Sequence, residues 1–236
     1  MGASLSGCSA AARELFAVAE RATQLPLAEV CFEGPADRLT DTAFAQPGVV
    51  AVSLAAAAAL DERLSELGVA ARAAMCAGHS VGEYSALGYS GALTVSDALK
   101  LVSARGKAMA EASSSADGSM VAVLGLDEEP LARVCSRASE ETGASVQVAN
   151  LNAPGQIVIS GSRRALDRAC ELAKEAGAKR AVALDVSGPF HSIYMQPAAD
   201  LFRGYVDAAP VAAPSVPVVL NVNARPSADP VELRRE

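Results

Sequence analysis

The sequence contains no tryptophan, and aromatic residues occupy only 4% of its 236 positions. A hydrophobic core must therefore be built mainly from alanine, valine and leucine, and the 51% of hydrophobic residues is enough for one. This length suits one large domain, or a domain that carries a smaller insert. The sequence also has no excess of basic residues, and its net charge is −7. That charge argues against a surface that binds nucleic acid or an anionic membrane.

Paired cysteines and targeting segments are also lacking. The five cysteines lie far apart without a C-x-x-C motif, which is typical of reduced thiols in a cytosolic protein and argues against a zinc site. The N-terminus does not show the basic and then apolar pattern of a signal peptide. The longest apolar run, residues 49–60, is too short to cross a bilayer. We therefore expect a soluble, cytoplasmic protein that holds no metal.

The hydrophobic pattern predicts both helices and strands. Periodicity of three to four residues predicts helices over 9–24 and 46–68. The short apolar segment 71–80 predicts a buried strand of a parallel sheet, followed by another helix. A further strand is expected within 214–226. This mixture indicates the α/β class.

The middle of the chain follows a different order of elements. Residues 116–187 read β-α-β-β-α-β, which is the order of a ferredoxin-like unit. We expect this segment to form a small inserted subdomain. Residues 1–115 and 188–236 would together form the larger domain.

The stretch "CAGHSVGEYSAL" (76–87) contains a G-x-S-x-G motif centred on Ser80. Ser80 falls where the predicted strand turns into a helix, and Gly78 and Gly82 lack the side chains that would clash in a tight turn. These are the features of a nucleophile elbow, which exposes the serine Oγ at the N-terminus of a helix. There the helix dipole and the backbone N–H of Val81 would stabilise an oxyanion.

A second interpretation of Ser80 is structural. Ser80 and Glu83 also form an S-x-x-E capping box, in which the serine only caps the helix. A nucleophilic serine needs a base, and the sequence has only two histidines. The side chain of His79 diverges from that of its neighbour Ser80, so His191, in a predicted loop, is the candidate base.

Arg105 is the third candidate residue, because it shares the apolar face of a predicted helix over 94–112. A buried arginine needs an anionic partner, since an unpaired buried charge is costly. The partner is either a core carboxylate in a structural ion pair or the carboxylate of a substrate held by two hydrogen bonds. Together, Ser80, His191 and Arg105 suggest covalent chemistry on an acyl group with a second carboxylate.

The sequence resembles the malonyl-CoA:acyl carrier protein transacylases of fatty-acid synthesis, which are related to the acyltransferase domains of polyketide synthases. The matching stretches follow the family order and include "TDTAFAQPGVVAVSLA", "GHSVGEYSAL", "LVSARGKAM", "NLNAPGQIVISG", "AGAKRAVALDVSGPFHSIYMQPAA" and "VPVVLNVNA". The resemblance implies an α/β-hydrolase-like larger domain with a ferredoxin-like smaller one.

The resemblance also implies a reaction. Ser80, with His191 as base, would take the malonyl group from malonyl-CoA and pass it to the phosphopantetheine thiol of acyl carrier protein. Arg105 matches the family arginine that pairs with the free malonyl carboxylate. Malonyl-CoA would be a substrate, and no cofactor, nucleic acid or membrane would be needed.

The chain departs from the family pattern at both ends. Family members open with a strand and a Gly-Gln-Gly segment that supplies a second oxyanion donor, and they continue past "VELRRE" into a helix and further sheet. We therefore expect a shortened chain with weak or no activity, because one oxyanion donor contributes roughly 10²–10³-fold to the rate. Three alternatives stay open, namely a serine hydrolase, a non-catalytic relative that binds carrier protein or coenzyme A, and a fragment of a polyketide synthase.

Overall fold

The computed structural model describes residues 1–235, which form two compact units. The large unit contains Met1–Lys107 and the C-terminal segment from Phe202 on, and the small unit contains Ala108–Leu201. The small unit is longer at both ends than the predicted subdomain over 116–187. The reason is that its limits fall inside two helices, α7 and α10, rather than in the loops beside the sheet.

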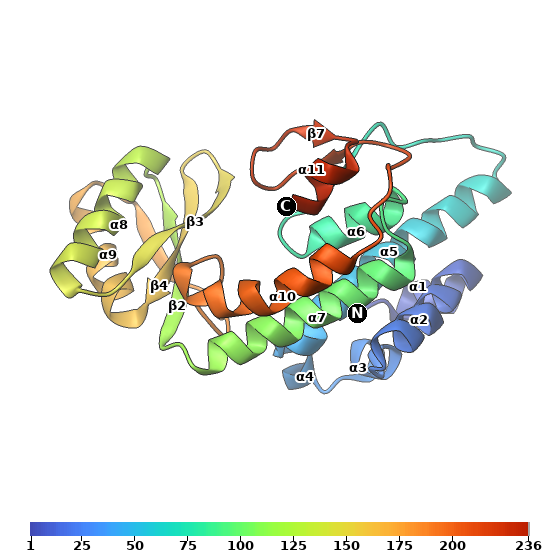
Figure 1. The fold of residues 1–236 in the computed structure, drawn as a ribbon, viewed down its shortest axis with the longest axis horizontal. Coiled ribbons are helices and arrows are strands. Elements are labelled where there is room, and N and C mark those ends of the chain that lie inside the picture. The colour runs from blue at the N-terminus through green and yellow to red at the C-terminus, as the bar shows by residue number, and fades with distance from the viewer. Residues whose placement is uncertain (236) are drawn as a thin grey trace. The chain divides into compact units, whose positions relative to one another are not determined.

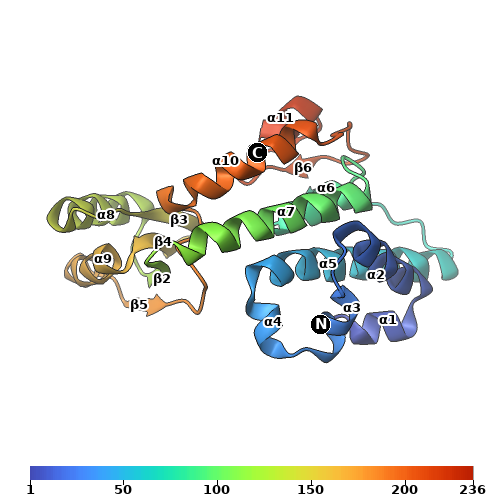
Figure 2. The same ribbon diagram turned by 60° about the horizontal axis from the view of Figure 1, so that its bottom comes forward.

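The described part of the large unit is mainly helical, with three very short strands (Figures 1 and 2). Its elements in chain order are α1 (Ala3–Cys8), α2 (Ala10–Thr23), α3 (Leu27–Glu33), α4 (Ala36–Thr40), α5 (Thr42–Glu66), β1 (Cys76–Ala77), α6 (Gly82–Tyr89), the first part of α7 (Val95–Ser114), the last part of α10 (Gln196–Ala208), β6 (Val218–Val219), β7 (Pro226–Ser227) and α11 (Pro230–Arg235).

Helix α5 is the longest helix among the described residues, and it begins four residues before the predicted start. The Asp41 carboxylate accepts a hydrogen bond from the N–H of Ala43 and caps the helix there. Pro47 therefore lies inside α5 instead of at its start. Helix α2 lies along α5 (Figure 2), and buried side chains of both helices form one hydrophobic cluster.

The length of α5 corrects the prediction that nothing in the sequence is long enough to cross a bilayer. By length and composition, Thr42–Glu66 passes as a membrane span. The estimate from residues 49–60 was too short because the helix also includes the small and apolar residues that precede this run. Its buried residues include Val50 and Leu54, which pack in the core cluster with Phe16 of α2. The first part of α5 thus contributes to the core of the large unit.

The three strands of the large unit form one small sheet in the order β1-β6-β7. β1 runs parallel to β6 with Cys76 opposite Val218, and β7 is antiparallel to β6. The predicted strand over 71–80 is therefore reduced to two residues, and the strand expected within 214–226 is two short strands. In the described chain, residues 71–75 have no neighbouring strand to pair with, and a strand without a partner is not stable in water.

The small unit contains a four-stranded antiparallel sheet in the order β3-β4-β2-β5. Its elements in chain order are the last part of α7, β2 (Gly118–Leu124), α8 (Glu128–Thr142), β3 (Val146–Ala153), β4 (Gln156–Ser162), α9 (Arg163–Glu175), β5 (Arg180–Ala183), the 3₁₀ turn η1 (Ile193–Met195) and the first part of α10. The first and third strands are neighbours at the centre of the sheet, which is the ferredoxin-like arrangement. The predicted order of elements and the α/β class are thus confirmed.

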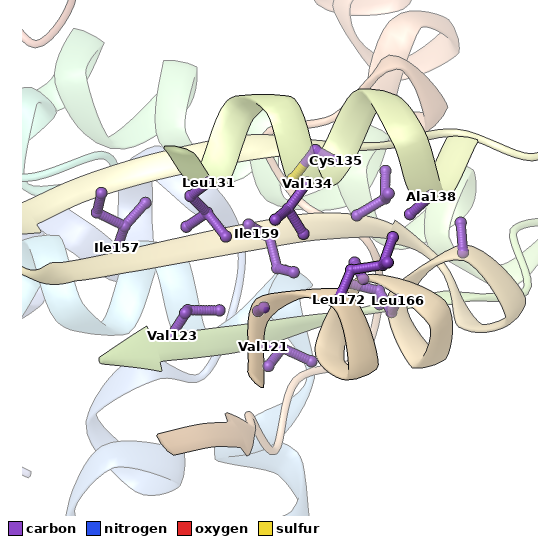
Figure 3. Close-up of a cluster of buried hydrophobic side chains, with 14 of the residues drawn as sticks. Val121, Val123, Leu131, Val134, Cys135, Ala138, Ile157, Ile159, Leu166 and Leu172 are labelled. Carbon is purple, nitrogen blue, oxygen red and sulfur yellow. The ribbon is translucent and has the colours of Figure 1, made fainter. Parts of the chain in front are cut away.

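Helices α8 and α9 of the small unit cover the same face of its sheet (Figure 3). On the central strands, Val121 lies opposite Ile159 and Val123 lies opposite Ile157. All four side chains are buried in a single cluster with apolar residues of α8 and α9. Leu166, Ala169 and Ala173 of α9 contribute to this cluster because they follow one another at steps of three and four residues, which keep them on one face of the helix.

Candidate active site

Ser80 lies in the tight connection between β1 and α6 and has a φ angle of +50°. This left-handed conformation is uncommon for a residue other than glycine and is found where the surrounding structure holds it. The turn is closed by a hydrogen bond from the N–H of Gly82 to the carbonyl of His79, at 2.9 Å. A strained serine between a strand and a helix is the geometry of a nucleophile elbow.

The capping interpretation of Ser80 is wrong. Helix α6 begins at Gly82, two residues later than that interpretation requires, and its N-cap is Val81 without a side-chain cap. The Ser80 Oγ instead accepts a hydrogen bond from Nη2 of Arg105 at 3.2 Å. The structure therefore brings together two of the three residues that the sequence singled out.

Only one of the two glycines in the motif lies in a space too small for a side chain. A Cβ added at Gly78 would overlap the carbonyl of Gly82 and would lie 2.6 Å from the backbone nitrogen of Glu83. A Cβ added at Gly82 would meet nothing within 4 Å beyond its own helix turn. The sequence prediction for Gly78 is thus supported, and the prediction for Gly82 is wrong.

We expect Gly78→Ala to lower the melting temperature by roughly 6–12 °C. The added methyl group collides with backbone that cannot move without opening the turn, and such overpacking costs about 3 kcal/mol. The matched variant Gly82→Ala should change the melting temperature by less than about 3 °C. Thermal unfolding followed by circular dichroism measures both, and equal shifts for the two variants would contradict this explanation.

Arg105 reaches this turn from α7. Its Nη1 donates to Oε1 of Gln46 at 2.6 Å, and its Cζ lies 5.9 Å from the centre of the Tyr84 ring. Among the described residues, none of the ion pairs includes Arg105. The interpretation as a structural ion pair is therefore wrong, because the side chains that receive hydrogen bonds from Arg105 are neutral.

Burial sets the electrostatics around Arg105. Loss of water lowers the pKa of its guanidinium, against the opposing effects of Tyr84 and Glu83. Burial also raises the pKa of Tyr84 to about 12, so this phenol stays neutral at physiological pH. A partly buried cation whose hydrogen-bond acceptors are neutral attracts an anion more strongly than an arginine in water does.

Gln46 and Asn221 also contact the site, although neither was among the residues predicted from the sequence. Gln46 is buried in the first turns of α5, and its hydrogen bond with Arg105 shows that it belongs to the site. The amide of Asn221 contacts both Gly78 and Ser80. A polar residue shortly after the end of a parallel strand is the signal that could have pointed to Asn221.

The N–H of Val81 is the backbone donor that the turn leaves available. The N–H of Ser80 donates to Asn221, and the N–H of Gly82 donates to His79. Among the described residues, no backbone hydrogen bond takes the N–H of Val81, which lies at the N-terminus of α6. The position assigned from the sequence is thus compatible with oxyanion binding.

His191 belongs to the small unit, in the loop between β5 and η1. Its φ angle is +56° and its side chain is exposed. The residues before it anchor the loop, because Pro189 is fully buried and Gly188 packs so tightly on Ser113 that a Cβ would overlap its hydroxyl. The imidazole is therefore presented from a fixed turn. Its pairing with Ser80 stays a prediction.

The chain was compared with known families and structures. Residues 1–235 match the family described as acyl transferase domain. A malonyl CoA-acyl carrier protein transacylase of Bacillus subtilis (strain 168) is 46% identical over 224 residues, which are 95% of this chain and 68% of that protein. The chain thus spans about two-thirds of the length of this relative.

Two solved structures support the same relationship. The acyl carrier protein S-malonyltransferase of Vibrio cholerae O1 biovar eltor is similar with a TM-score of 0.90 at 38% identity, over 100% of this chain and 74% of that one. A malonyl-transacylase solved with its type II PKS acyl-carrier protein has a TM-score of 0.90 at 35% identity, over 100% of this chain and 74% of that one. The chain therefore belongs to the acyl transferase family, as a homologue of the malonyl CoA-acyl carrier protein transacylases.

Proposed function

We propose that this chain transfers a malonyl group from malonyl-CoA to the phosphopantetheine thiol of acyl carrier protein, through an ester on Ser80. The observation that carries the proposal is the 3.2 Å hydrogen bond between the Ser80 Oγ and an arginine whose other hydrogen-bonding partner is a neutral amide. It places a candidate nucleophile beside a cation that can bind a carboxylate. The names of the relatives agree with this substrate pair.

The first half-reaction follows from the roles of the residues. His191 takes the proton of the Ser80 hydroxyl while Oγ attacks the thioester carbonyl, and the N–H of Val81 stabilises the oxyanion. The tetrahedral intermediate then collapses, the carbon–sulfur bond breaks, and coenzyme A leaves with the proton from His191. In the second half-reaction the carrier thiol attacks the ester and the same proton transfers run in reverse.

Arg105 explains why a malonyl group is favoured. In malonyl-serine, one carbonyl carbon and one methylene carbon separate the serine oxygen from the free carboxylate. A guanidinium that already touches Oγ is therefore at a suitable distance for that carboxylate. The methyl group of an acetyl substrate accepts no hydrogen bonds. Binding of an acetyl group would therefore leave the Arg105 guanidinium without an anionic partner.

We propose no metal and no organic cofactor for this reaction. Within residues 1–235 there is no group of three His, Cys, Asp or Glu side chains that could hold a metal ion. Acyl transfer between thiols requires only a nucleophile, a base and an oxyanion site. We also place the protein in the cytoplasm, where its cysteines would stay reduced.

Intact-mass analysis tests the proposal directly. The chain mixed with malonyl-CoA should gain one malonyl group, and carrier protein with its phosphopantetheine arm should remove it. Loss of the adduct to water faster than to carrier protein would indicate a serine hydrolase instead. Binding of coenzyme A or carrier protein without any adduct would indicate the non-catalytic alternative.

We expect Gln46→Glu to slow malonyl adduct formation by about tenfold. The new carboxylate would take the position that now lies 2.6 Å from Nη1 of Arg105 and would compete with the malonyl carboxylate, an effect of roughly 1.5 kcal/mol, the lower value for a hydrogen bond to a charged group. The rate of adduct formation measures the effect. Gln156→Glu adds the same charge at an exposed position of the small unit and should leave the rate unchanged. An unaltered rate in Gln46→Glu would remove Gln46 from the site.

A further inference from the structure

Asn221 follows β6 by two residues and makes three hydrogen bonds to the segment that carries Ser80. Its Nδ2 donates to the carbonyl of Gly78 at 2.8 Å, and its Oδ1 accepts from the N–H of Ser80 at 2.8 Å. Its own backbone N–H donates to Oε1 of Glu83 at 3.3 Å. One residue near the C-terminus therefore holds both sides of the turn.

The two amide bonds continue the parallel ladder between β1 and β6. Backbone pairing ends with Ala77 opposite Val219. Two residues further along both strands, His79 would lie opposite Asn221. In a parallel ladder, the N–H of a residue donates to the carbonyl of the residue that precedes its partner. Its C=O accepts from the N–H of the residue that follows its partner. For His79 those groups are the carbonyl of Gly78 and the N–H of Ser80.

The side chain of Asn221 replaces its backbone in this extra rung. The backbone N–H of Asn221 is used by Glu83, and the side-chain amide has the same two hydrogen-bonding groups as a peptide bond. The sheet is thereby extended to the point where the chain turns sharply at Ser80. Aspartate would keep the acceptor and lose the donor, and leucine would lose both.

This rung restrains the backbone on both sides of His79 directly before the strained residue. A left-handed serine persists only where neighbouring contacts hold it. The rung also occupies the N–H of Ser80, which leaves the N–H of Val81 as the available donor of the turn. Both effects act on where Oγ and the oxyanion donor point, and neither involves the malonyl carboxylate.

We propose that Asn221 is a positioning residue, which holds the Ser80 turn in its reactive conformation by completing the sheet with its side-chain amide. The inference rests on the proposed function in one respect, namely that Ser80 is the nucleophile. Because misplacement of a reacting group by about 1 Å can cost roughly 10²-fold in rate, the effect of losing the rung should be large.

The test compares Asn221→Leu and Asn221→Asp with the same changes at Asn223. Asn223 is an exposed residue of the same loop, whose Oδ1 accepts a hydrogen bond from the N–H of Arg225. We expect kcat for malonyl transfer to fall roughly 10²-fold in Asn221→Leu and about tenfold in Asn221→Asp, with KM for malonyl-CoA within twofold. Both Asn223 variants should keep at least half of the wild-type kcat.

The final malonyl stoichiometry and the comparison with the Asn223 variants distinguish a positioning role of Asn221 from a general structural role. The Asn221 variants should still reach one malonyl group per chain at long times, because the protein is folded and the acylation is only slower. A lower final stoichiometry with an unchanged rate, or equal losses in the Asn223 variants, would overturn the proposal. Rates within twofold of the wild type would overturn it too.

A second reagent makes the test independent of the substrate. A fluorophosphonate modifies an activated serine without a malonyl group, so its rate of labelling at Ser80 reports the conformation of the turn. If the wild type is labelled by the fluorophosphonate and is not acylated by malonyl-CoA, the proposed function fails and the labelling rates of the Asn221 variants still decide the inference. If neither malonyl-CoA nor the fluorophosphonate modifies Ser80 in the wild type, the proposed role of Asn221 is overturned.

Discussion

A Ser80→Ala variant mixed with malonyl-CoA should show no malonyl adduct in its intact mass, and its transfer rate should fall on the order of 10⁶-fold. The Oγ of Ser80 accepts a hydrogen bond from Arg105 and is the proposed nucleophile, so the variant lacks the atom that would carry the malonyl group. Thermal unfolding should show that the variant is folded, because the hydroxyl makes no cap for α6.

The matched control for Ser80→Ala is Ser85→Ala. Ser85 is on α6, shortly after the motif, and its buried Oγ has no hydrogen-bond partner among the described residues. This variant should form the adduct at the wild-type rate. An adduct that survives in Ser80→Ala would show that the nucleophile lies elsewhere, and peptide mapping would then test other groups, including the exposed thiol of Cys8.

Arg105→Ala should lose between 10²- and 10³-fold in the rate of malonyl transfer and should change acetyl transfer by less than tenfold. Removing one member of a desolvated charged pair costs about 2–5 kcal/mol, and the expected loss lies within this range. An acetyl group has no carboxylate, so its reaction gains nothing from the guanidinium. The ratio of malonyl to acetyl transfer, measured from kcat/KM with both thioesters, reports the change in selectivity.

Two variants on the same helix sharpen the Arg105 experiment. Arg105→Lys keeps the charge without the planar pair of donors and should give an intermediate malonyl rate. Lys107→Ala removes an exposed positive charge two residues away and should behave as the wild type. A malonyl-to-acetyl ratio that is the same in Arg105→Ala and the wild type would exclude Arg105 as the carboxylate site.

The geometry also relates the stability of the elbow to its reactivity. Gly78 allows the turn by having no side chain, and Asn221 holds the turn by an amide rung. Gly78→Ala should therefore reduce stability, whereas Asn221→Leu should mainly reduce rate. The two substitutions act on the same few residues and separate the requirement for space from the requirement for orientation.

The sequence by itself determined the features that depend on neighbours along the chain. Ser80 and its motif occupy consecutive positions, and the helices and strands of the small unit follow from periodicity over a few residues. Arg105 was identified by its place on an apolar helix face. Such patterns are readable because the interactions that produce them join residues that are close in the sequence.

The tertiary structure alone decided which distant residues complete the site. Gln46 lies 59 positions before Arg105, and Asn221 lies 141 positions after Ser80. Gln46 has no local pattern that differs from an ordinary polar residue in a helix, and the place of Asn221 shortly after a strand does not show which turn it contacts. The short length of β1 could not be predicted from the sequence either, because a strand extends only as far as a neighbouring strand pairs with it. Long-range hydrogen bonds depend on chain packing, which residue spacing does not record.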